Sequence, residues 1–220
     1  MRRAAKALYT RKTYLHSMFV TIEGLDGSGK STVLEAITEQ YPTAVTTSEP
    51  SDRQYGKLVR ENLADEGTHG LIDFYLFMAD RIDHIEERVR PTDESGNLVV
   101  SDRYADSTRA YQPVALTNAG LFDSQFEAKD FIEHTMNPWN YPPDLTLYID
   151  ISVDTAIERA AGDEKYEKRD FLSKVKDNYD ALADSEAFGD RIVRVDGEQS
   201  KEDVKKSALG KLDVVAPDRL

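Results

Sequence analysis

The feature that most constrains this chain is a nine-residue glycine-rich segment, Gly24-Leu25-Asp26-Gly27-Ser28-Gly29-Lys30-Ser31-Thr32. It fits the phosphate-binding pattern G-x-x-x-x-G-K-[S/T], and the flanking residues predict the required strand (19–22) and helix (32–40). Glycines let backbone N–H groups turn toward phosphate oxygens, and the helix dipole adds to the attraction. We expect Lys30 to reach the outer phosphates and the Ser31 hydroxyl to bind Mg²⁺. The alternative, an ordinary glycine-rich turn, leaves the flanking strand and helix unexplained.

The composition argues against several classes of protein. The chain has 220 residues, 40% of them hydrophobic, which is enough for one large domain or two small ones. It has no apolar run long enough to span a membrane. It has no cysteine, so disulfides and cysteine-bound metals are excluded and the cytoplasm is the simplest compartment. The formal net charge of −13 is the opposite of what a nucleic-acid-binding protein usually shows. We therefore expect neither nucleic acid nor a membrane as a partner.

The charge distribution leaves two questions open. The excess of 41 acidic over 28 basic residues fits a protein from a high-salt cytoplasm, and it equally fits an ordinary acidic protein. Residues 1–17 carry five basic and no acidic residues. They resemble a transit peptide in charge but have few hydroxyls and no clear cleavage site. The alternatives are a disordered tail or a start site placed too early, with Met18 as the natural start. We expect the folded domain to cover residues 18–215.

Strand-like and helix-like patterns alternate along the chain. Apolar runs predict strands at 19–22, 44–47, 97–100, 145–149 and 192–195. Helical patterns lie between and after them, at 32–40, 52–64, 71–89, from 107, 123–136, 153–161, 169–183 and 201–209. We expect Pro91 to stop the long third helix. Helical crossovers imply an α/β fold with a five-stranded parallel sheet, helices on both faces, and ligands at the carboxyl ends of the strands.

A second set of residues fits the site for a phosphate acceptor. The apolar strand at 97–100 delivers Asp102 and Arg103 to the carboxyl edge of the sheet. Asp102 is suited to hold a Mg²⁺-bound water or to take a proton, and Arg103 to clamp a phosphate with its planar fork. A strand-end salt bridge is the alternative. Phe77 and Arg81 share one face of the long helix and could stack on a base and bond its edge, although Phe77 also fits a core stripe.

In order along the chain, these motifs resemble those of the thymidylate kinases, the P-loop enzymes that pass a phosphoryl group from ATP to dTMP. The resemblance runs from Met18 almost to the end of the chain. It rests on residues 24–32, 77–81, 102–104 with 107–108 and 110–112, 143–150, and 195–197. It implies a P-loop NTPase fold with a lid segment at about 159–169, and ATP and Mg²⁺ as cofactors. It also implies a homodimer.

The resemblance implies a thymidylate pocket. Phe77 would stack on thymine and Arg81 would bond its O4 edge. Thr108 and Gln112 would lie near N3 of the base. Arg103 would hold the dTMP phosphate.

It also implies contacts with the sugar and with ATP. Tyr111 would close on the sugar and disfavour a 2′-hydroxyl. Asp26 would face the sugar 3′-hydroxyl or a Mg²⁺-bound water. Asp196 would lie near the adenine of ATP. All nine residues from Gly24 to Thr32 would bind the nucleotide, with Ser31 and Asp102 at the metal.

The chain departs from the family pattern in two places. Family members often have an arginine where this chain has Ser48. Either Arg53 folds back into the site, or the acceptor phosphate is held less tightly. In the lid, where relatives read Asp-Arg-Phe-Glu, this chain has Lys165 in the arginine position. We expect Lys165, with Arg159 as the second candidate, to neutralise the γ-phosphoryl group. A solvated charged loop is the alternative for this segment.

The sequence therefore predicts a kinase that makes dTDP from dTMP with Mg·ATP, with Lys30, Asp102, Arg103, Lys165 and Arg159 at the reacting phosphates. Two alternatives stay open. One is a kinase for another nucleoside monophosphate, and the other is a nucleotide-dependent switch without catalysis.

Overall fold

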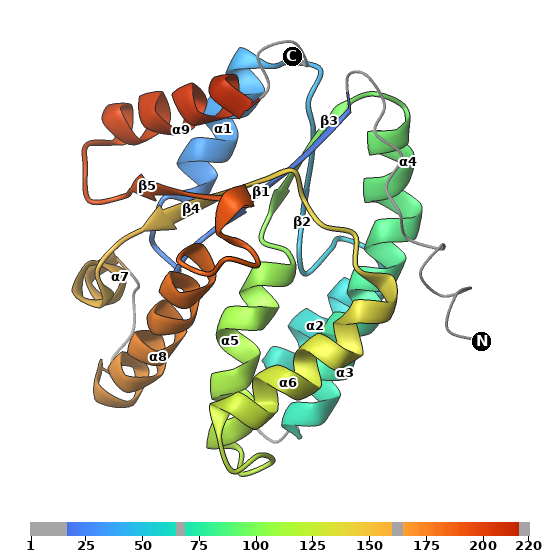
Figure 1. Cartoon of the computed structure of the whole chain (residues 1–220), viewed down its shortest axis with the longest axis vertical. Coiled ribbons are helices and arrows are strands. Elements are labelled where there is room, and N and C mark those ends of the chain that lie inside the picture. The colour runs from blue at the N-terminus through green and yellow to red at the C-terminus, as the bar shows by residue number, and fades with distance from the viewer. Residues whose placement is uncertain (1–16, 65–68, 160–164, 216–220) are drawn as a thin grey trace.

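Five parallel strands form one sheet in the order β2-β3-β1-β4-β5 (Figure 1). The computed structural model describes residues 17–64, 69–159 and 165–215, without the side chains of residues 165–168. The strands are β1 (Met18–Glu23), β2 (Val45–Ser48), β3 (Leu98–Asp102), β4 (Leu145–Asp150) and β5 (Ile192–Asp196). The helices are α1 (Lys30–Gln40), α2 (Gln54–Leu63), α3 (Gly70–His84), α4 (Arg90–Glu94), α5 (Ala105–Asn118), α6 (Gln125–Met136), α7 (Val153–Arg159), α8 (Lys165–Ala183) and α9 (Lys201–Val215). The predicted α/β class and parallel five-stranded sheet are confirmed.

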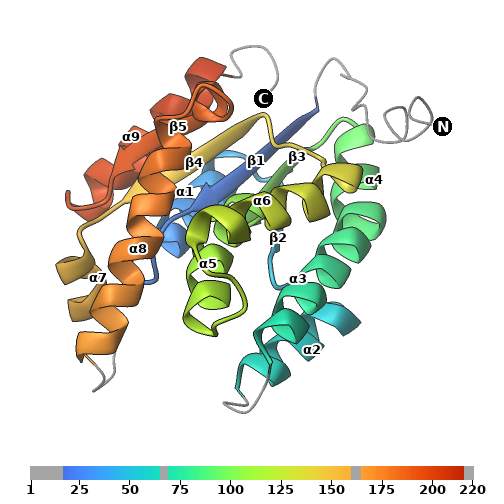
Figure 2. The ribbon, with the colours of Figure 1, turned by 60° about the horizontal axis from the view of Figure 1, so that its bottom comes forward.

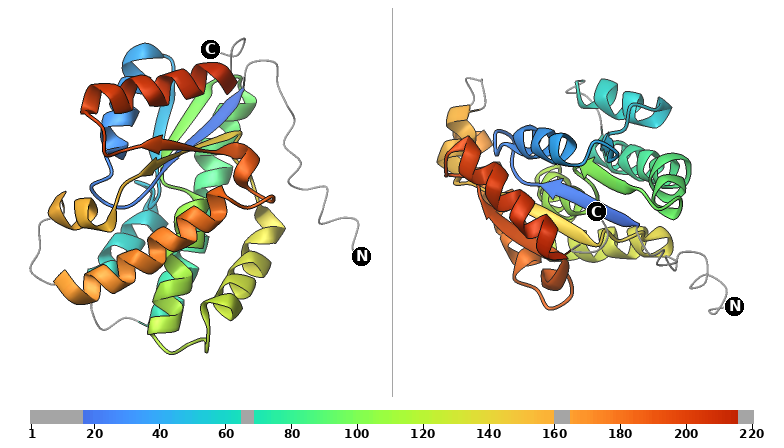
Figure 3. Two further views of the ribbon diagram at one scale, coloured as in Figure 1. Left: turned by 60° about the vertical axis from the view of Figure 1, so that its left-hand side comes forward. Right: turned by 90° about the horizontal axis from the view of Figure 1, so that it is seen from above.

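Helices cover both faces of the sheet, as the apolar strands require. Every residue of the central strand β1 is buried, which is typical of a parallel sheet with two covered faces. On one face α1 and α9 lie side by side and pack on β1, β3, β4 and β5 (Figure 3). On the other face lie α3, α5, α6 and α8 (Figure 2). The carboxyl ends of β1 and β3 open between these helices, and this edge carries the site.

The long third helix does not stop at Pro91, contrary to the prediction. It continues from α3 through the π-helical turn η2 (Ile85–Val89) into α4, with Pro91 in the first turn of α4. In η2 the N–H of Arg90 bonds to the carbonyl of Ile85, five residues back. This wider turn gives room for the proline ring, which has no N–H to donate and would clash in a regular helix.

Other boundaries differ by a few residues. Helix α8 begins at Lys165, so residues 165–168, predicted to be without pattern, are helical. Helix α9 extends to Val215, beyond the predicted end. Residues 1–16 of the predicted basic extension lie outside the described residues, whereas Ser17 is buried. In the part of the chain that the structure describes, no helix is both long and apolar enough to cross a membrane.

Candidate active site

The glycine-rich segment forms a tight loop between β1 and α1. Gly24 and Gly27 have φ of 141° and 79°, values that side-chain-bearing residues rarely adopt. A Cβ at Gly24 would lie 2.5 Å from the carbonyl oxygen of Ile149 in β4, and one at Gly27 would lie 2.9 Å from Cβ of Arg159. Glycine is therefore required at both positions, because the loop packs directly against β4 and α7.

Lys30 lies at the start of α1 and is folded onto its own loop. Its Nζ donates to the carbonyls of Leu25 at 2.8 Å and Gly24 at 3.3 Å, and lies 3.8 Å from Oδ1 of Asp26. Burial, together with the nearby positive charge of Arg103, lowers the pKa of Lys30 to about 8. Phosphate oxygens would offer this ammonium stronger acceptors than carbonyls do.

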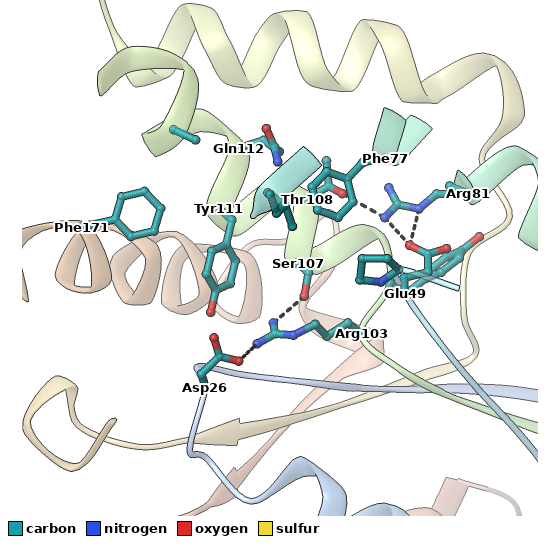
Figure 4. Close-up of a pocket in the computed structure, with 14 residues that line it drawn as sticks. Asp26, Glu49, Phe77, Arg81, Arg103, Ser107, Thr108, Tyr111, Gln112 and Phe171 are labelled. Atoms are coloured by element: carbon teal, nitrogen blue, oxygen red, sulfur yellow. Dashed lines mark hydrogen bonds and ion pairs between the residues drawn. The ribbon is translucent and has the colours of Figure 1, made fainter. Parts of the chain in front are cut away.

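A pocket of about 280 Å³ opens at the carboxyl ends of β1 and β3 (Figure 4). It contains all seven side chains predicted to bind the acceptor: Asp26, Phe77, Arg81, Arg103, Thr108, Tyr111 and Gln112. Phe77 and Arg81 come from α3, and Tyr111 faces them from α5. The remaining lining residues were not predicted: Glu49, Pro50, Leu63, Tyr104, Ser107, Ala115 and Phe171. Phe171 belongs to α8, which no motif connected with this site.

Arg103 lies at the floor of the pocket in a left-handed backbone conformation, with φ of 66°. Its Nη2 donates to Oδ1 of Asp26 at 2.5 Å and its Nη1 to Oγ of Ser107 at 2.9 Å. The guanidinium also lies 5.2 Å from the ring centroid of Tyr111. A left-handed conformation costs a residue such as arginine about 1–2 kcal/mol, so the surrounding contacts must hold it. The predicted strand-end salt bridge exists, but it joins Arg103 to the phosphate-binding loop.

Beneath Arg103 lies Glu23, a buried carboxylate that sequence reasoning missed. Its Oε1 accepts from the backbone N–H groups of Tyr104 at 2.8 Å and Ser107 at 3.2 Å. Its Oε2 accepts from Tyr179 Oη at 2.9 Å and Ser107 Oγ at 2.6 Å. Burial raises the pKa of Glu23 to about 7, with the carboxylate of Asp106 adding to the shift. The only signal in the sequence was an acidic residue ending an apolar strand directly before the loop.

The sequence also allowed Phe77 to belong to a stripe of core residues, and that interpretation is correct for its neighbours on α3. Phe74 and Met78 are buried in the core, together with Ile85 of the following turn. Phe77 lies at the edge of that core, half-buried, and lines the pocket. Arg81 lies one turn later and is held by Glu49, which Figure 4 shows beside it.

Asp102 and Ser31 offer oxygen atoms near the loop. Asp102 ends β3, and its Oδ1 is buried without a hydrogen-bond partner among the described residues. Its charge acts on Lys30, raising the pKa of that ammonium against the effect of burial. Ser31 lies exposed in the first turn of α1. Mg²⁺ in nucleotide sites is commonly bound by one or two protein oxygens together with phosphates, and this donor set fits it.

A second pocket of about 190 Å³ lies on the other side of the loop. Its lining residues are Gly27, Ser28, Gly29, Thr32, Arg159, Gly197, Gln199, Lys201 and Val204. Arg159 of α7 donates from Nη1 to the carbonyl of Gly27 at 3.1 Å and lies 3.5 Å from that of Gly197. Asp196 itself accepts from the N–H of Glu198 and the amide of Gln199 within its own turn. The side chain of Lys165 lies outside the described residues.

Arg53 does not fold back into the acceptor pocket. Its guanidinium pairs with Asp83 and lies 3.8 Å from Glu87, and it lines a separate polar pocket. Ser48 directs its hydroxyl toward the carbonyl of Pro50 at 3.4 Å. Arg53 therefore does not replace the arginine that family members often have at the position of Ser48. Weaker binding of the acceptor phosphate, the other interpretation, stays a prediction.

Comparison with known proteins identifies the family. A sequence model described as thymidylate kinase matches residues 22–208. The chain belongs to the thymidylate kinase family. It is 40% identical over 202 residues to a probable thymidylate kinase of Halobacterium salinarum strain R1, which covers 91% of this chain and 98% of that protein. A probable thymidylate kinase of Halorubrum lacusprofundi is 40% identical over 188 residues, covering 85% and 93%. One of Methanococcoides burtonii is 36% identical over 195 residues, covering 86% and 93%. The chain is thus a phosphotransferase of the P-loop class, as predicted.

Proposed function

We propose that this kinase transfers the γ-phosphoryl group of ATP to dTMP, giving dTDP and ADP. The observation that carries the proposal is the pocket at the ends of β1 and β3. It gathers all seven side chains expected to bind dTMP and opens beside the phosphate-binding loop. Asp26 belongs to that loop and pairs with Arg103, so the two sites meet at one ion pair.

The base and sugar would be bound by the upper part of the pocket. Phe77 offers a ring face for stacking on thymine, and Arg81 offers a guanidinium N–H to O4. Thr108 and Gln112 are both buried and line the pocket next to Arg81, where N3 of the ring would lie. The ring of Tyr111 lines the same pocket and lies beside the guanidinium of Arg103, so it would face the sugar and crowd a 2′-hydroxyl.

The reaction would be an in-line displacement. An oxygen of the acceptor phosphate, held by Arg103, forms a bond to the γ-phosphorus while the bond to the β–γ bridging oxygen breaks and ADP leaves. Lys30 would swing from the carbonyls of Gly24 and Leu25 onto the phosphates. Mg²⁺, held by Ser31 and Asp102, would supply further positive charge at the same oxygens. Arg159, and Lys165 from the start of α8, would neutralise the γ-phosphoryl group from the lid.

Two further properties belong to the proposal. Exposed apolar side chains on the adjacent helices α2 and α3 support a homodimer formed through this face: Leu58, Leu63, Ile72 and Tyr75. Light scattering after size exclusion tests this, because a monomeric mass contradicts it. A cytoplasmic location fits a chain without cysteine.

The test is an ADP-release assay with ATP, Mg²⁺ and a panel of nucleoside monophosphates. We expect dTMP to give the highest kcat/KM and the ribonucleotides to give the lowest values. A preference for another monophosphate would establish the rival substrate. Nucleotide binding without any acceptor-dependent ADP release would indicate a switch in place of a kinase.

A further inference from the structure

Glu49 and Arg81 line the acceptor pocket and form a cluster with His84, and the three side chains are 4%, 4% and 1% exposed. Oε2 of Glu49 accepts from Arg81 Nε at 2.9 Å and from Nη2 at 2.5 Å. Oε1 accepts from Nδ1 of His84 at 3.0 Å. Both oxygens of the carboxylate are therefore fixed by cations or N–H donors from α3.

His84 connects this cluster to the sheet. The Glu49 carboxylate only accepts, so Nδ1 of His84 carries the proton, and Nε2 faces Oγ1 of Thr47 at 2.6 Å. Thr47 lies in β2 opposite Ser101 of β3. The backbone N–H of Glu49 also donates to the carbonyl of Asp102 at 3.0 Å. The carboxylate is thus fixed relative to the end of β3, the strand that precedes Arg103.

The hydrogen bonds of Arg81 show what this arrangement achieves. Nη2 donates to Thr108 Oγ1 at 2.9 Å as well as to Glu49, and Nη1 faces Sδ of Met136 at 3.6 Å. With the Nε bond to Glu49, four of the five N–H groups of the guanidinium have partners. One N–H on Nη1 has none among the described residues, and Arg81 lines the pocket beside Phe77 (Figure 4). One N–H donor therefore remains on a guanidinium that lines the pocket proposed to bind the base.

We propose that Glu49 and His84 are positioning residues that make the pocket select a pyrimidine with a ring carbonyl over one with an amino group at the same position. The hydrogen bonds to Glu49 and Thr108 fix the orientation of the Arg81 guanidinium. A guanidinium can only donate hydrogen bonds, so it requires an acceptor on the base. A carbonyl oxygen accepts from it, whereas an amino group would place donor against donor and leave a buried N–H without an acceptor. Thr108 already accepts from Arg81, so its own proton is also directed to an acceptor. This inference rests on the proposed thymidylate function and names what enforces its base specificity.

The test compares dTMP with dCMP in the wild type, Glu49→Gln and His84→Phe. Calorimetry gives the dissociation constants of dTMP and dCMP, and the weaker ligand is measured by competition with the stronger one. The kcat and KM values for turnover are measured as well. In Glu49→Gln we expect the preference for dTMP to fall roughly tenfold or more, through weaker dTMP binding, with KM for ATP unchanged. His84→Phe should shift the preference in the same direction by less. Glu49→Asp, which keeps the charge but shortens the reach, should lie between wild type and Glu49→Gln.

Asp93→Asn is the matched control. Asp93 is another fully buried carboxylate, it accepts from Tyr141 Oη at 2.6 Å, and it does not line the pocket. Its amide variant should keep the wild-type preference. A folded Glu49→Gln protein with wild-type preference overturns the inference, and so does an equal loss in Asp93→Asn. If the wild type binds dTMP selectively without turning it over, the proposed function fails while the binding ratios still decide the role of Glu49. A wild type that does not prefer dTMP overturns both.

Discussion

At the scale of single residues, the cations of the site already have hydrogen-bond partners within the protein. Lys30 bonds to carbonyls of its own loop, and Arg103 pairs with Asp26 and Ser107. Substrate binding must therefore exchange partners, and the free energy gained is the difference between two sets of hydrogen bonds. The residue-scale predictions depend on this exchange.

Lys30 should make ATP binding depend on pH. Burial lowers its pKa to about 8 in the free protein, and phosphate oxygens would raise it again, so the bound state holds more protons. ATP affinity should then fall as the pH rises above about 8, with proton uptake on binding. Calorimetry at this pH in two buffers of different ionisation enthalpy measures the uptake, since the terminal phosphate, with a pKa of about 6, is already ionised there. Lys30→Met should bind without uptake, and equal uptake in both proteins would contradict the assignment.

Arg103→Ala should weaken dTMP binding far more than ATP binding. The loss of a charged clamp on phosphate corresponds to about 1.5–3 kcal/mol. Separate titrations with dTMP and ATP measure the two affinities. A fall in ATP affinity alone would show that Arg103 serves the donor site and that the acceptor site has been wrongly placed.

At the scale of helices and strands, α7 and the turn after β5 form one side of the loop. Arg159 contacts the carbonyls of both Gly27 and Gly197. Glu198, from the same turn, accepts from the N–H of Ser152 at 2.7 Å and from the hydroxyl of Thr155 at 2.8 Å, which fixes the start of α7. The base of the proposed lid is thus attached to the loop through contacts within the protein.

This attachment gives different expectations for the two lid cations. Arg159→Ala should lower the affinity for ATP as well as kcat, because Arg159 already lines the pocket beside the loop. Lys165→Ala should lower kcat by roughly tenfold with little change in KM for ATP, if its charge reaches the phosphates only on closure. Steady-state kinetics of both variants decide between them. Wild-type kinetics in Lys165→Ala would leave Arg159 as the lid cation.

The sequence predicted most elements and the members of the pocket, because these follow from local patterns and ordered motifs. It failed where the cause lay far away along the chain, or in a local geometry that periodicity does not reveal. Glu23 accepts a hydrogen bond from Tyr104, which lies 81 positions later in the sequence. Glu49 accepts one from Arg81, which lies 32 positions later. Pro91 remains in a helix because of a π turn before it, which no periodicity reveals. The ion pair of Arg53 with Asp83 likewise depends on how α2 packs against α3.

At the scale of the whole molecule, the net charge of −13 governs how stability responds to salt. Most of this charge lies on the surface, where the screening length falls from about 30 Å at 0.01 M salt to about 3 Å at 1 M. Less repulsion between like charges should favour the compact state. The buried pair of Glu49 and Arg81 should respond little, because it is shielded from ions.

We therefore expect Tm to rise as KCl increases over this range, measured by thermal unfolding. Sucrose, which stabilises by exclusion and carries no charge, is the control for non-electrostatic effects. An activity maximum in molar KCl would favour adaptation to a high-salt cytoplasm, and activity highest at low salt would favour an ordinary acidic protein. A Tm independent of KCl would show that surface repulsion is unimportant.

One carboxylate lies close to the cations of both proposed substrate sites. Oδ1 of Asp26 lies 2.5 Å from Nη2 of Arg103 and 3.8 Å from Nζ of Lys30. By the proposed mechanism, ATP would draw Lys30 away from Asp26, and dTMP would draw Arg103 away from it. Each ligand thus changes the electrostatic cost of admitting the other, and thermodynamics requires the two changes in affinity to be equal. The coupling between the two substrates then runs through a single side chain, and replacing Asp26 should weaken it.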